Sequence, residues 1–141
     1  MSERKYLPTL AELIDRLSIV QLKEVFIPEN KDEYAKEIKD IMNDIDIILV
    51  EYDQSGHTGA VPLTAKTIRD IIILSQSNLH IWHNESAARQ GNKDGNKLLL
   101  THSINGIRNT AKNRIQELVG GRKDLKVDCC AAEFCQFEPS W

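Results

Sequence analysis

Several residue types and patterns are scarce in this 141-residue chain, and each scarcity argues against a class of protein. The three cysteines, Cys129, Cys130 and Cys135, lie close together near the end of the sequence, and an odd number with two adjacent is a poor disulfide framework. Their spacing lacks the paired CxxC motifs of a zinc site. No apolar run approaches the roughly 20 residues that cross a bilayer. We therefore expect reduced thiols that pack as small apolar side chains, and no membrane partner.

Charge of one sign and recognisable catalytic loops are also lacking. The formal net charge is −3 with 28% charged residues, so there is no global basic field, and we expect no nucleic-acid partner. The start, MSERKYLP, has charge but no apolar stretch behind it, which argues against a signal peptide and for a cytoplasmic location. Phosphate-binding loops, GxGxxG and nucleophile-elbow motifs are absent. Without such motifs, the sequence does not indicate a particular reaction.

What the sequence does contain is helical periodicity. Four segments, at about 9–26, 31–52, 64–90 and 97–119, carry apolar residues at helical spacing, and no segment makes a convincing strand. We predict an all-α protein, an antiparallel four-helix bundle formed by residues 1–121. Residues 122–141 form an irregular C-terminal tail, in which Phe134, Phe137 and Trp141 dock on the bundle or on a neighbouring subunit.

The ends and faces of these segments are specific enough to test. Thr9 followed by Glu12 is a capping box that starts the first helix. The second segment has the cleanest stripe, made of Tyr34, Ile38, Ile41, Ile45, Ile48 and Tyr52. The third segment is apolar over so wide an arc, including Ile68, Ile72 and Leu79, that we expect it to be the central helix. One bundle layer would not cover that arc, so we also expect a homodimer or larger assembly.

The most informative feature lies on this third segment, within NLHIWHNESAAR. Asn78, Trp82, Glu85 and Arg89 follow one another at i, i+4, i+7 and i+11, so a helix at about 100° per residue places them within about 60° of one another. The stripe continues backwards through apolar Leu74. Burying unpaired polar groups costs about 1–3 kcal/mol each, so a stripe that served only as core would carry leucine there.

A ligand pocket is one interpretation of this stripe. The short turn after residue 90 brings Asn105 and Arg108 of the fourth segment within reach of Arg89. Guanidinium groups bind phosphate or carboxylate bidentately, and Trp82 offers a stacking face. We therefore expect a small anionic ligand, a nucleotide or nucleotide-sugar, near that turn. A wider version of the pocket adds Arg16 and Lys23 of the first segment as basic lining.

Two alternatives stay open, and a metal site is a third that we do not expect. The stripe can be a buried ion-pair and amide network, such as Glu85 with Arg89 or Arg108, that fixes helix register in a structural or interaction protein. Alternatively, His83 and Glu85 transfer protons in a hydrolase or transferase acting on such a ligand. His80 and His83 have the i, i+3 spacing of metal ligands, but His80 lies on the solvent side of the stripe, so we expect neither a metal nor another cofactor.

Three motifs resemble an uncharacterised all-helical family of bacteria and tailed phages, often encoded beside glycosyltransferases. Its patterns are LIDxLxIxxxK, NxxxWHxExxAR and NxxRN, and this chain matches them over roughly residues 9–115. The matching residues are Asp15, Arg16, Ile19, Lys23, Asn78, Trp82, His83, Glu85, Arg89, Asn105, Arg108 and Asn109. The family has no established activity, so the resemblance implies a site on these residues without implying a reaction.

Overall fold

The computed structural model contains four α-helices in the part of the chain that it describes. It describes residues 7–54, 63–89, 95–120 and 139–141, with only the backbone of 53–54, 86–89 and 95–102. The helices are α1 (Leu10–Phe26), α2 (Lys31–Gln54), α3 (Ala65–Arg89) and α4 (Gly95–Gln116), with a 3-10 turn, η1 (Pro28–Asn30), before α2. These ranges contain no strand, and the predicted all-α class is confirmed.

Local hydrogen bonds explain where the helices begin and end. The hydroxyl of Thr9 accepts from the backbone N–H of Glu12 at 3.3 Å, which caps α1 as the sequence predicts. Thr64 caps α3 in the same way, accepting from the N–H of Thr67 at 3.2 Å. Beyond α4, Gly120 has a φ of +73°, a conformation that glycine adopts without strain, and its N–H donates to the carbonyl of Gln116 at 3.0 Å.

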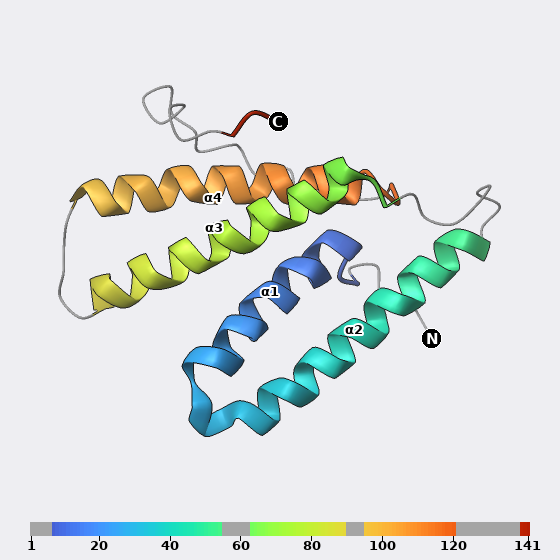
Figure 1. Ribbon diagram of the computed structural model, residues 1–141, viewed down its shortest axis with the longest axis horizontal. Helices are drawn as coiled ribbons and strands as arrows, with labels where there is room; N and C mark the ends of the chain where they lie inside the picture. Colours follow the sequence, from blue (N-terminus) through green and yellow to red (C-terminus); the bar gives the residue numbers. More distant parts are fainter. Residues whose placement is uncertain (1–6, 55–62, 90–94, 121–138) are drawn as a thin grey trace.

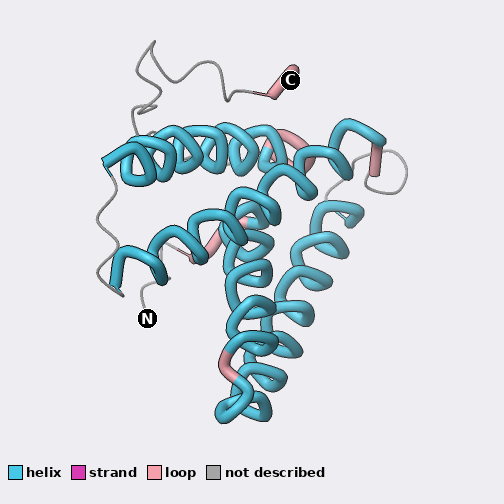
Figure 2. Tube along the Cα trace, turned by 60° about the vertical axis from the view of Figure 1, so that its left-hand side comes forward, coloured by secondary structure: helices cyan, strands magenta, loops and turns pink. Residues whose placement is uncertain are grey.

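The helices form two hairpins, α1–α2 and α3–α4, that lie across each other (Figures 1 and 2). Among these helices α1 contacts all three others, whereas α2 packs only against α1 and η1. Figure 2 shows the α1–α2 hairpin extending away from the α3–α4 layer. The prediction that the third helix is central is therefore wrong, because α1 occupies that position.

Two apolar clusters follow from this arrangement. The first, Ala11, Leu74, Ala111 and Ile115, joins α1, α3 and α4. The second joins α1 to α2, where the predicted apolar stripe faces inward, and its members are Leu13, Leu17, Val20, Tyr34, Ile38, Ile41, Ile45 and Ile48. Because α1 contributes to both clusters, its burial connects the two hairpins.

The wide apolar arc of α3 is not all covered. Ile68, Ile72 and Leu79 lie on the outer side of α3 with 46%, 49% and 38% of their surface exposed. The sequence interpretation expected that one bundle layer would not cover the whole apolar arc, and these three residues lie on its uncovered side. They form an exposed apolar row because α2 packs on α1 and leaves this side of α3 uncovered.

The last residues of the chain dock on the α3–α4 hairpin. Trp141 packs against the first cluster, and the guanidinium of Arg114 lies 5.2 Å from the centre of its ring. Arg114 also pairs with the buried carboxylate of Asp70 at 3.1 Å, and Arg69 donates to the carbonyl of Ser140. The docking predicted for Trp141 is thus seen on the bundle. Phe134, Phe137 and the three cysteines lie outside the described residues.

Candidate functional site

The carboxylate of Asp15, on α1, is held by side chains from two other helices, α3 and α4. Asn78 of α3 donates to its Oδ1 at 2.8 Å. Arg108 of α4 binds it bidentately, through Nε to Oδ1 at 3.2 Å and through Nη2 to Oδ2 at 2.8 Å. The ammonium of Lys112, one turn along α4, lies 3.8 Å from Oδ2. Asp15 and Asn78 are 6% and 4% exposed, so this ion-pair network lies inside the bundle.

The electrostatics of the Asp15 network favour an ionised carboxylate. Burial raises the pKa of Asp15, but hydrogen bonds from Arg108 and Asn78 act in the opposite direction, as do the charges of Arg108 and Lys112. Their combined effect is larger, and the pKa of Asp15 lies below its ordinary value of 3.8. The network therefore holds a negative charge whose positive partners come from α4.

Helix periodicity explains how the sequence builds this network. Arg108 and Lys112 are four residues apart, so they project from one side of α4 on consecutive turns. Arg108 also donates to the amide oxygen of Asn105, one turn earlier, at 3.3 Å. This second contact fixes the guanidinium in the orientation that serves Asp15.

A hollow of about 350 Å³ lies beside the Asp15 network, along α1. Seven of its nine lining residues come from α1, and the complete set is Pro8, Glu12, Leu13, Asp15, Arg16, Ile19, Val20, Lys23 and Lys112. Arg16 pairs with Glu37 of α2 at 2.7 Å and is largely exposed. Lys23 forms no ion pair with any residue in the described part of the chain. The hollow thus carries three basic and two acidic side chains.

Aromatic side chains gather at the far end of α1. Phe26, its last residue, stacks against Trp82 of α3 with ring centres 6.4 Å apart and planes 24° from parallel. His83 meets Phe26 edge-on at 5.4 Å. Trp82 is half-buried, His83 is exposed and Phe26 is 46% exposed. We call Phe26, Trp82 and His83 the aromatic cluster.

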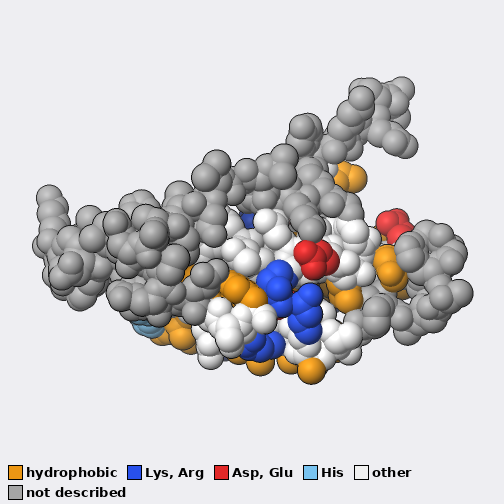
Figure 3. Space-filling model, turned by 90° about the horizontal axis from the view of Figure 1, so that it is seen from above, with side chains coloured by type: hydrophobic (Ala, Val, Ile, Leu, Met, Phe, Trp, Pro, Cys, Tyr) orange, Lys and Arg blue, Asp and Glu red, His pale blue; other side chains and the backbone are white. Residues whose placement is uncertain are grey.

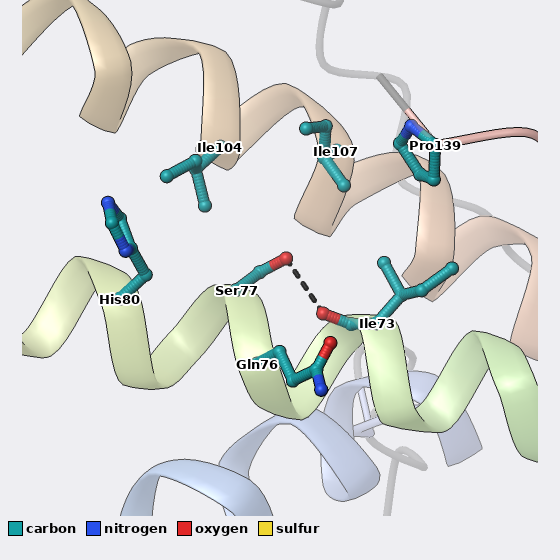
Figure 4. A pocket seen from close by; sticks show the side chains of 7 residues that line it. All are labelled: Ile73, Gln76, Ser77, His80, Ile104, Ile107 and Pro139. Atoms are coloured by element: carbon teal, nitrogen blue, oxygen red, sulfur yellow. Dashed lines mark hydrogen bonds between the residues drawn. The ribbon is translucent and has the colours of Figure 1, made fainter. Parts of the chain in front are cut away.

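A second hollow, of about 230 Å³, lies between α3 and α4 under Pro139 (Figure 4). Its walls are mainly apolar, and the hydroxyl of Ser77 is directed to the carbonyl of Ile73, to which it donates at 2.7 Å. His80 and Gln76 stand on the α3 side (Figure 4). This hollow has no arginine or lysine in its lining, so it is unsuited to an anion.

The eight residues predicted to bind a ligand divide into separate places. Asn78, Asn105 and Arg108 meet in the Asp15 network, and Arg16 and Lys23 line the hollow along α1. Trp82 is in the aromatic cluster, Glu85 is exposed, and the side chain of Arg89 lies outside the described residues. Among the predicted basic residues whose side chains are described, Arg16 and Lys23 thus line a hollow along α1, while Arg108 binds Asp15.

The partner proposed for Arg108 also needs correction. The sequence interpretation named Glu85 as the acid that Arg89 or Arg108 would neutralise, but Arg108 binds Asp15. Glu85 lies on the predicted stripe and yet is exposed, because it falls near the end of α3. The two candidate proton-transfer residues, His83 and Glu85, line neither hollow.

Three contributors were missed by sequence reasoning about the site. Sequence reasoning named Asp15 without giving it a role, and it did not single out Lys112 or Phe26 as site residues. One signal was available for Asp15, since an aspartate between Ile14 and Leu17 in a strongly apolar helix costs stability unless it has a cationic partner. No comparable signal marked Phe26, whose neighbours come from another helix.

The described ranges lack the features of two other classes of site. They contain no group of three or more His, Cys, Asp or Glu side chains arranged to hold a metal ion. None of their helices is long and apolar enough to cross a membrane. On the face seen in Figure 3, a small group of Lys and Arg side chains has an acidic side chain beside it, so the described part of this face has no broad basic field.

Comparisons with family models, with curated proteins and with solved structures find no match to this chain. The resemblance of its three motifs to a helical family therefore stays a prediction.

The Asp15 network predicts a specific dependence of stability on pH. Replacing Asp15 with Asn leaves the partly buried guanidinium of Arg108 without the carboxylate that binds it, and we expect a loss of about 3 kcal/mol of unfolding free energy near neutral pH. The folded-state pKa of Asp15 is lowered, so its stabilisation is present above the ordinary value of 3.8 and is lost as the pH falls through the folded value. Urea unfolding should show the two proteins converging in acid.

The exposed pair Arg16–Glu37 supplies the control. Arg16→Met should change the unfolding free energy by less than about 1 kcal/mol at neutral pH, because an exposed ion pair is screened by solvent. A stability deficit of Asp15→Asn that is equally large in acid would contradict the assigned role of the carboxylate.

Proposed function

We propose that this protein binds a small anionic ligand in the hollow along α1. The observation that carries the proposal is the lining itself, in which Arg16, Lys23 and Lys112 surround a space of about 350 Å³. A volume of this order is typical of a small-molecule site. The phosphate-bearing class, including nucleotides and nucleotide-sugars, fits the ammonium and guanidinium groups that are present.

The carboxylate of Asp15 in the lining does not argue against an anion. Asp15 is already bound bidentately by Arg108, so its charge is compensated from within the bundle. Arg108 and Asn78 bind Asp15 and do not line the hollow, so they affect the ligand only by holding Asp15 in place. Lys23, which has no ion pair in the described ranges, is then the cation left to meet the ligand.

The enzyme alternative receives less support from the geometry. A general acid or base must lie within hydrogen-bond reach of the group that it protonates. His83 and Glu85 are exposed and do not line the hollow, so the proposal is for binding without a reaction. Product analysis of any ligand that binds tests this choice. A cytoplasmic location, in which the cysteines stay reduced, belongs to the same proposal.

Removing the charge of Lys23 should weaken ligand binding without unfolding the protein. We expect Lys23→Met to lower affinity for pyrophosphate or a nucleoside diphosphate by about 2 kcal/mol or more, the usual loss when a charge-assisted contact is removed. Isothermal titration measures the affinity, and a melting curve verifies the fold.

The matched control is Lys36→Met, which removes the same charge from the exposed side of α2, away from the hollow. It should bind as the unchanged protein does. Equal losses in the two variants would show that the affinity reflects net charge alone and would contradict a site at Lys23.

A second candidate function is interaction through an apolar surface, and the exposed row on α3 favours it. Large adjoining apolar patches on a folded protein commonly mark a protein-protein interface. Ile68, Ile72 and Leu79 are 38–49% exposed along one side of α3. A second copy of the chain covering this row would account for the predicted homo-oligomer.

A homo-oligomer formed through the exposed row on α3 can be tested by sedimentation. The protein should sediment as a dimer or larger species at tens of micromolar, and Ile72→Glu should shift it to a monomer, because a buried unpaired carboxylate is costly. Lys66→Glu, at an exposed position outside the row, provides a charge-changing comparison that should leave the assembly intact. A wild-type protein that is monomeric throughout this range would contradict the prediction.

A further inference from the structure

The hollow and the aromatic cluster lie on the same side of α1. Ile19 and Lys23 line the hollow, and Phe26 continues their side of the helix, within about 60° at 100° per residue. A rise of 1.5 Å per residue places Phe26 about 5 Å beyond Lys23 along the axis. The basic and aromatic surfaces are therefore consecutive along the helix.

Helix α3 connects the two ends of this surface. Its Asn78 binds Asp15, which lines the hollow, and its Trp82, one turn later, stacks against Phe26, which lies beyond Lys23 on α1. The position of the aromatic rings relative to the hollow is thus fixed by the same pair of helices. A ligand extending from Lys23 toward the end of α1 meets aromatic surface next.

The exposure of the aromatic cluster is the second observation. Phe26 contacts two rings yet remains 46% exposed, which leaves part of its surface available for a further ring. Aromatic side chains attract planar bases by stacking, and this interaction tolerates any base because every base has a π-face. A partner with an aromatic ring fits this surface better than a sugar or a bare phosphate.

We propose that the ligand is a nucleotide whose phosphates lie in the hollow at Lys23 and whose base stacks on Phe26 beside Trp82. This inference rests on the proposed anion site and adds the ligand class and a new binding residue, Phe26. In this arrangement Lys23 supplies the charge, Phe26 and Trp82 supply the stacking surface, and the Asp15 network keeps α1 and α3 in place.

The test compares ligands that share a phosphate but differ in the base. Isothermal titration is carried out with the four ribonucleoside diphosphates and with ribose 5-phosphate, on the unchanged full chain and on Phe26→Leu. Leucine keeps an apolar side chain but removes the π-face. We expect Phe26→Leu to weaken the best-bound nucleoside diphosphate about tenfold. Affinity for ribose 5-phosphate should change by less than twofold.

Two further variants separate the possible outcomes. Lys23→Met should weaken nucleotide and ribose phosphate alike, whereas Val25→Ala, at a neighbouring exposed apolar residue, should weaken neither. Equal effects of Phe26→Leu on both ligands, or no effect on either, would overturn the nucleotide inference while leaving the anion site standing. If neither ligand class binds the unchanged protein, the anion site and the inference both fail.

Discussion

A single buried carboxylate connects the two hairpins of this protein. Asp15 lies on α1, the helix that contacts each of the others, and it receives hydrogen bonds from Asn78 of α3 and Arg108 of α4. An unpaired buried charge is strongly destabilising. The helices α1, α3 and α4 must therefore lie where Asn78 and Arg108 can reach the Asp15 carboxylate. The apolar clusters stabilise the fold by burying apolar surface, while the Asp15 network fixes one relative position of α1, α3 and α4.

The proposed ligand site depends on these relative positions of the helices. Seven residues that line the hollow come from α1. Lys112, a basic lining residue from α4, lies near the carboxylate of Asp15. Because Arg108 neutralises Asp15 from inside the bundle, the hollow can present Lys23 to an anion without strong repulsion from Asp15. The same crossing of α1 and α3 brings Trp82 to Phe26, next to the hollow.

Much of the fold was predictable from the sequence, because helical periodicity and capping residues are local signals. The stripe from Tyr34 to Ile48 and the cap at Thr9 both appear as expected. Burial around α3 was not predictable, since the exposure of Ile72 depends on where α2 packs. The candidate site was found only in part for the same reason. Its polar residues were recognisable, but the acid that pairs with Arg108 comes from a helix 93 residues away in the sequence.

The most direct test of the central role of Asp15 is a double-mutant cycle with Arg108, measured as unfolding free energy at neutral pH. Arg108→Met alone should destabilise the protein by about 3 kcal/mol, because it leaves the Asp15 carboxylate buried with too few partners. The loss in the double mutant with Asp15→Asn should fall short of the sum of the two single losses by a coupling energy of about 1–3 kcal/mol. Strictly additive losses would contradict the account, because they would show that the two side chains stabilise the fold independently.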